Sequence, residues 1–157
     1  MSAIFAWFLL VSPADAADAV LYVVRHAEKA TAPAADPPLT PAGQARAEAL
    51  AKLLKDVPLA AVHSTDTTRT RTTAAPTSTA GKLTPALYDA IPPLVAAIRA
   101  TGGAHLVVGH SNTIADIVSA AGGDPGPAVA DTEFDRLYVV VLPDAGKPTT
   151  IRLHYGP

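Results

Sequence analysis

The chain contains no cysteine among its 157 residues. Disulfides, thiolate metal ligands and a thiol nucleophile are therefore excluded. Charged residues are also scarce, at 17%, and the formal net charge is only −2. With so little charge of either sign, the sequence lacks the basic patch that nucleic acids or anionic membrane surfaces attract. We expect no nucleic-acid partner, and any anion site must be built locally from a few arginines.

The N-terminal apolar run is too short to cross a bilayer, which takes about 20 residues. The run is AIFAWFLLV, residues 3–11, and the small-residue pattern Ala14-Asp15-Ala16 follows it. This arrangement is typical of a secretory signal peptide cleaved near Ala16, although no Lys or Arg precedes the apolar run. We therefore predict a signal peptide over residues 1–17, a periplasmic or secreted location, and no stable membrane association after cleavage. An N-terminal core helix is the alternative.

Residues 18–157 have the length of one domain, and the chain is 49% hydrophobic, which suffices for a core. Apolar runs alternate along it with segments of helical spacing. Expected strands cover 19–24, 59–64, 104–108, 135–143 and 149–155, and expected helices cover 41–57, 67–76, 92–103 and a segment from Ser111 to Gly122. This alternation predicts an α/β fold: a three-layer sandwich with a mainly parallel central sheet, helices on both faces and an antiparallel edge from the closing pair.

Polar side chains follow three of the expected strands. Arg25 and His26 come directly after the first, Arg69 lies shortly after the second, and His110 and Ser111 follow the third. Each group alone is typical of surface or structural residues. Because the carboxyl ends of parallel strands share one edge of a sheet, where ligands bind, we expect the three groups to meet there.

These residue types suit a phosphoryl group. Arginine grips two phosphate oxygens with a planar fork, and a helix beginning near Ser111 would add free N–H groups. A neutral imidazole can attack phosphorus through one ring nitrogen while the other is held by a hydrogen bond. The sequence therefore predicts a phosphate site at the sheet edge.

Four ordered blocks support this prediction: RHAE at 25–28, LTPAGQARAEAL at 39–50, STDTTRTRTTA at 64–74 and VVGHSN at 107–112. Over about residues 19–142 the chain resembles the histidine phosphatase superfamily, the phosphoglycerate-mutase-like phosphatases, and in particular a small exported branch.

The resemblance implies a role for each matched residue. His26 would become phosphorylated, Arg25 and Arg69 would grip the phosphate, and His110 would stabilise the phosphoryl group in transfer. Ser111 would add a further phosphate contact. No metal and no cofactor is implied.

The proton donor to the leaving oxygen is left open. Asp89 lies at about the distance along the chain where mutase-like members carry their acid, and Glu28 lies close to the nucleophile. Asp89 could equally be a helix cap. If neither serves, the enzyme would favour substrates with good leaving groups, such as phosphohistidine, acyl phosphates or aryl phosphates. Ala27 replaces the usual glycine, and Arg71 is expected to be a solvated or helix-capping residue.

The leading hypothesis is a metal-independent phosphatase that hydrolyses small phosphomonoesters or phosphohistidine-type substrates through a phosphohistidine on His26. The alternatives are a non-catalytic phospholigand-binding module and a mutase-like phosphotransferase, which the lack of long inserted segments disfavours. A metal hydrolase is a further alternative, but no His-x-x-x-His pair occurs. His63, His105 and His154 are expected to pack within or at the ends of strands.

Overall fold

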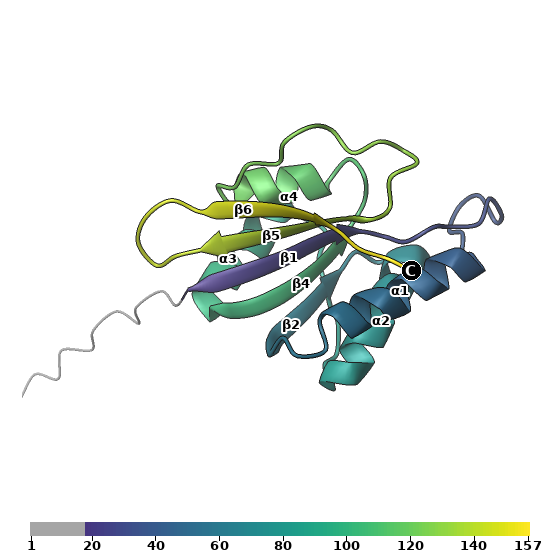
Figure 1. Ribbon diagram of the computed structural model, residues 1–157, viewed down its shortest axis with the longest axis horizontal. Helices are drawn as coiled ribbons and strands as arrows, with labels where there is room; N and C mark the ends of the chain where they lie inside the picture. Colours follow the sequence, from purple (N-terminus) through teal and green to yellow (C-terminus); the bar gives the residue numbers. More distant parts are fainter. Residues whose placement is uncertain (1–17) are drawn as a thin grey trace, which may run out of the picture.

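The computed structural model describes residues 18–157, which form a six-stranded sheet with helices on both faces (Figure 1). The strands are β1 (Ala19–Arg25), β2 (Leu59–Ser64), β3 (Ala86–Leu87), β4 (Gly103–Gly109), β5 (Arg136–Leu142) and β6 (Thr149–His154). The helices are α1 (Pro41–Leu53), α2 (Thr68–Gly81), α3 (Ile91–Thr101) and α4 (Ile114–Ala120).

The sheet is mixed, with the order β3-β2-β4-β1-β5-β6. β1, β2, β3 and β4 are parallel, whereas β5 runs antiparallel to β1 and β6 runs antiparallel to β5. The predicted α/β sandwich with an antiparallel edge is thereby confirmed. The short strand β3 is an addition that its two residues gave no pattern to predict.

β1 is apolar throughout because both of its faces are covered. Leu21 and Val23 pack in a core cluster with Ile98 of α3. Val24 belongs to a second cluster, which contains Leu50 of α1. In Figure 1, α3 and α4 lie on one face of the sheet and α1 and α2 on the other. Buried strands of this kind read as continuous apolar runs rather than alternating ones.

From the sequence we expected helix α2 to end at Pro76. In the structure it continues to Gly81. A proline removes one helical hydrogen bond. Here the helix is held on both sides of it, because Thr73 before Pro76 and Thr77 after it are both buried. The helix ends where Lys82 takes a left-handed conformation, with φ of 54°.

Two further local expectations are wrong. Residues 111–113 form a turn, so α4 begins at Ile114 rather than near Ser111. The N-cap of α3 is Ala90, without a side-chain hydrogen bond, so Asp89 does not cap that helix.

The expected signal peptide lies outside the described residues and stays a prediction. Within residues 18–157, no helix is long and apolar enough to span a bilayer.

Candidate active site

His26 directly follows β1, and its backbone N–H donates to the carbonyl of Gly109 at the end of β4 (2.8 Å). The side chain is buried, and its Nδ1 lies 2.8 Å from the carbonyl oxygen of Ala27. Because a carbonyl only accepts, Nδ1 carries the proton and Nε2 keeps its lone pair. Burial, with the nearby charges of Arg25 and Arg69, lowers the pKa of His26 to about 4. The ring is therefore neutral at neutral pH, as a nucleophile requires.

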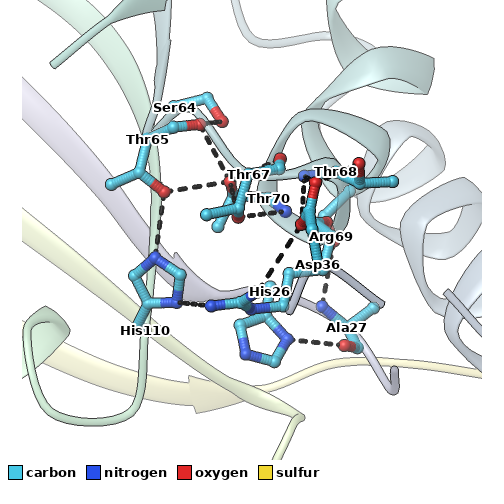
Figure 2. Close-up of polar contacts among 11 residues, drawn as sticks. His26, Ala27, Asp36, Ser64, Thr65, Thr67, Thr68, Arg69, Thr70 and His110 are labelled. Carbon is cyan, nitrogen blue, oxygen red and sulfur yellow. Dashed lines mark hydrogen bonds and ion pairs between the residues drawn. The ribbon is translucent and has the colours of Figure 1, made fainter. Parts of the chain in front are cut away.

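His110 follows β4, the neighbouring parallel strand, and its ring centroid lies 5.5 Å from that of His26. Figure 2 shows the two imidazoles side by side, with the guanidinium of Arg69 close to both. The Nδ1 of His110 lies 3.4 Å from Nη2 of Arg69, and its Nε2 lies 3.0 Å from Oγ1 of Thr65. Since a guanidinium only donates, Nδ1 accepts and Nε2–H donates to Thr65. Burial and the two arginine charges lower the pKa of His110.

Arg25 is held by backbone carbonyls of the segment before β5. Its Nη1 donates to the carbonyl oxygens of Asp131 and Glu133 (2.9 Å each) and of Ala130 (3.2 Å). The ring of Phe134 lies 4.1 Å from the guanidinium carbon. The Nε of Arg25 is buried and has no hydrogen-bond partner among the described residues. The arginine is thus fixed from one side, with a donor left over.

Arg69 reaches the two histidines from the first turn of α2. Its Nη1 lies 3.8 Å from the carboxylate of Asp36, whose oxygens also accept from the backbone N–H and hydroxyl of Thr68 (Figure 2). The Nε of Arg69, like that of Arg25, is buried without a partner in the described part of the chain. Buried donors without a partner are rare, and a bound ion or water is one explanation for them. The hydroxyls of Thr77 and Tyr155 are buried without a partner in the described residues as well.

A single hydroxyl joins the nucleophile segment to α2. The Oγ1 of Thr73 accepts from the backbone N–H of Ala27 (2.9 Å) and donates to the carbonyl oxygen of Arg69 (2.7 Å). One residue therefore sets the position of the chain just after His26 relative to the helix that carries Arg69.

Glu28 is engaged in an ion pair with Arg46 of α1. Nε and Nη2 of Arg46 donate to its carboxylate at 3.0 and 2.7 Å, and Arg46 also donates to the carbonyl oxygen of Tyr155. Burial by itself would raise the pKa of Glu28, but the hydrogen bonds and charge of Arg46 outweigh it and hold the pKa below its ordinary value. An ionised carboxylate has no proton to donate.

The other two candidates stand apart from this group. Asp89 is exposed, on the segment between β3 and α3. Ser111 is half-buried in the turn before α4, where the neighbouring hydroxyl of Thr113 accepts from the backbone N–H of His110 (3.0 Å). The structure thus brings together His26, Arg25, Arg69 and His110, and it shows no hydrogen bond from Asp89 or Ser111 to these four.

The remaining polar clusters lie elsewhere. His63 and His105 pair with each other (3.0 Å), which agrees with a packing role, whereas His154 is exposed and does not pack as expected. Ligand atoms of Glu133, Asp135 and His154 lie within 4.8 Å of one another. The carboxylate of Glu133 is already bound by an arginine, Arg136, at 2.6 Å.

Arg71 pairs with Asp66 on the surface, as expected of a solvated residue.

Residues 21–92, which contain Arg25, His26 and Arg69, match the family model described as the histidine phosphatase superfamily (branch 1). The match covers slightly less than half of the chain. Three of the four blocks that carry the resemblance, at 25–28, 39–50 and 64–74, lie within the matched residues, whereas VVGHSN at 107–112 lies outside them. No curated protein matches the sequence.

Several solved structures share the fold of most of this chain. The protein histidine phosphatase SixA, complexed with tungstate, matches with a TM-score of 0.71 at 19% identity, over 86% of this chain and 96% of that one. A phosphoglycerate mutase from Bacillus anthracis matches at 0.68 and 18% identity, over 88% and 94%. A mycobacterial glucosyl-3-phosphoglycerate phosphatase matches at 0.68 and 13% identity, over 88% and 99%. These identities establish the fold and not the substrate.

Proposed function

We propose that this protein is a metal-independent phosphatase that forms a phosphohistidine on His26. One observation carries the proposal: the neutral ring of His26 lies beside His110 and near two arginines whose buried Nε donors have no partner among the described residues. A tetrahedral dianion is the ligand that such an arrangement of arginine donors fits.

The reaction would proceed in two displacements. Nε2 of His26 attacks phosphorus, the bond from phosphorus to the leaving oxygen breaks, and that oxygen takes a proton. Water then attacks the phosphorus of phosphohistidine, the N–P bond breaks, and inorganic phosphate leaves with neutral His26 restored. The carbonyl of Ala27 holds the Nδ1 proton throughout. Arg25 and Arg69 stabilise the charge on the equatorial oxygens, which is the main source of catalysis in phosphoryl transfer. His110 would join them once its Nδ1, which accepts from Arg69 in the free protein, carries a proton.

Which residue protonates the leaving group, if any does, decides which substrates can react. Glu28 is ionised by its pair with Arg46, and Asp89 is exposed on the segment after β3. We therefore propose small substrates with good leaving groups, such as phosphohistidine or aryl phosphates, which need no donor. For other substrates we propose Asp89 as the donor, on its place in the sequence alone. A periplasmic or secreted location belongs to the same proposal, and it rests on the sequence of residues 1–17 alone.

Phosphate release tests the nucleophile. The full chain and its His26→Ala variant are assayed with p-nitrophenyl phosphate, a phosphohistidine peptide and 3-phosphoglycerate, with His154→Ala as control because that histidine is exposed. We expect at least about a 10³-fold loss in His26→Ala and none in the control. An alkaline quench followed by intact-mass measurement should detect one phosphoryl adduct in the wild type. Activity that survives in His26→Ala would overturn the mechanism, and transfer without hydrolysis would indicate a mutase.

The pH profile follows from the pKa of His26. Because that pKa lies at about 4, the imidazole stays neutral from pH 7 down to about 5. kcat/KM is therefore expected to change little over that range and to fall as the pH drops through about 4, where a proton occupies Nε2. Because a phosphomonoester itself ionises at about pH 6, the profile is compared for two substrates of different phosphate pKa. An acid limb near the ordinary histidine pKa that does not move with the substrate would contradict the buried, neutral nucleophile.

A further inference from the structure

Arg136, the first residue of β5, is a buried arginine that the reaction above does not use. Its Nε and Nη2 bind both carboxylate oxygens of Glu133, at 2.6 and 2.8 Å. Its Nη1 donates to the carbonyl oxygen of Pro127 (2.6 Å) and to the hydroxyl of Tyr138 (3.0 Å). A buried guanidinium with this many partners fixes the segment before β5 in one arrangement.

Glu133 connects Arg136 with Arg25. Its carboxylate binds Arg136, while its own backbone carbonyl accepts from Nη1 of Arg25. The same carboxylate accepts from the backbone N–H of Ala130 (3.4 Å), whose carbonyl also accepts from Nη1 of Arg25. Two of the three carbonyls that hold Arg25 are thus tied, directly or through one bond, to the carboxylate that Arg136 grips.

Phe134 extends this connection to the nucleophile. It follows Glu133 in the chain, lies under the guanidinium of Arg25, and has its ring centroid 6.1 Å from that of His26. A shift of residues 130–134 would therefore move the support of Arg25 and one wall of the nucleophile's surroundings together.

We propose that Arg136 is a positioning residue that, through Glu133, holds the carbonyls of residues 130–133 so that the remaining donors of Arg25 stay aimed at a phosphoryl group on His26. The inference rests on the proposed function. It adds to the site a residue that touches neither the substrate nor the nucleophile.

The test compares Arg136→Met, Arg136→Lys and a control, Arg99→Met. Arg99 donates to the carbonyl of Ala121 at the other end of the segment between α4 and β5, so its loss removes an anchor that does not reach Arg25. The dissociation constant of inorganic phosphate, kcat and KM for p-nitrophenyl phosphate, and the melting temperature are measured for each. A misplacement of about 1 Å costs on the order of 10²-fold. We expect Arg136→Met to weaken phosphate binding and kcat/KM about 10- to 100-fold, Arg136→Lys to restore little because lysine has no fork, and the control to stay within about twofold.

The pH at which kcat/KM falls on the acid side distinguishes a variant in which Arg25 is misplaced from a variant that is only less stable. Arg25, Arg69 and His110 all face His26, and each lowers the pKa of His26. If Arg25 leaves its place, that pKa rises and the acid limb moves to higher pH. A variant that is merely less stable melts at a lower temperature but keeps the wild-type limb.

Each outcome bears on the inference. Should Arg136→Met not accumulate as folded protein, Glu133→Gln keeps the shape and removes the charge, and we expect a several-fold change in the same direction. Unchanged phosphate affinity in these variants, or an equal loss in Arg99→Met, would overturn the role of Arg136. A wild type that binds phosphate without hydrolysing any substrate would refute the proposed phosphatase and leave the affinity comparison decisive. A wild type that binds no phosphate would refute both.

Discussion

Arg25 and Arg69 reach the surroundings of His26 from different elements, and they are held in different ways. Three backbone carbonyls and the face of Phe134 hold Arg25, which is only 6% exposed. Arg69 has one long contact with His110 and an ion pair at 3.8 Å with Asp36, a side chain that is 48% exposed.

The two arginines differ in how firmly they are held and in whether their partners are charged. Backbone carbonyls do not ionise, and they leave the net charge of Arg25 for the phosphoryl group. Asp36 instead competes with a substrate for Arg69 and is itself open to solvent. Preorganised groups contribute most to transition-state stabilisation because they need no rearrangement during the reaction. Arg25 is therefore expected to contribute to kcat, and Arg69 mainly to substrate capture.

The largest effect is expected from Arg25→Met. Removal of a preorganised donor to developing charge costs on the order of 10²–10³-fold. We expect kcat/KM for p-nitrophenyl phosphate to fall about 10³-fold, mostly through kcat. Steady-state kinetics measure this, with circular dichroism as a check on folding. A change confined to KM would show that the fixed arginine acts no differently from the loosely held one.

A smaller effect is expected from Arg69→Met. Its guanidinium must move from Asp36 to the substrate, so part of its binding energy is spent on rearrangement. We expect kcat/KM to fall about 10²-fold, with a rise in KM larger than the fall in kcat. The same rate assay and the dissociation constant of inorganic phosphate check it. A loss as large as that of Arg25→Met, carried by kcat, would contradict the distinction.

The smallest effect is expected from Asp36→Asn, which removes the competing charge but keeps an oxygen for the backbone N–H of Thr68. Because the pair is exposed, its interaction is weak and screened by salt. We expect the KM for p-nitrophenyl phosphate to fall about two- to fivefold at low ionic strength, and the difference to vanish at about 1 M salt. An unchanged KM at low salt would show that Asp36 does not compete with the substrate.

Much of the fold could be predicted because its signals are local. β1 is apolar along its whole length because both faces are buried, and Thr40 with Pro41 marks the start of α1 by a side-chain hydrogen bond to Gly43. Pro76 misled the prediction, since tertiary burial of the residues around it outweighs the loss of one helical hydrogen bond.

Some residues of the site could likewise be predicted from local signals, and others could not. Arg25 is the last residue of β1, and His26, Arg69 and His110 each follow a strand within a few residues. The rule that ligands bind at the carboxyl ends of strands therefore suffices to group these four. The carbonyls of residues 130–133 carry no sequence signal, because any residue presents a carbonyl. The role of Arg136 could not be predicted from the sequence either, since it depends on a segment whose path no periodicity predicts.

The register of β1 and β4 has a consequence for how this protein could change. Arg25, the last residue of β1, pairs with Gly109, the last residue of β4. His26 and His110 are the next residue after each strand and therefore lie at the same level of the sheet. Neighbouring strands lie about 4.8 Å apart, and the two imidazole centroids lie 5.5 Å apart. The register thus sets the two histidines side by side, and the bonds to Ala27, Thr65 and Arg69 orient their rings. We therefore expect that changes in the surrounding loops could admit other substrates while this separation is kept.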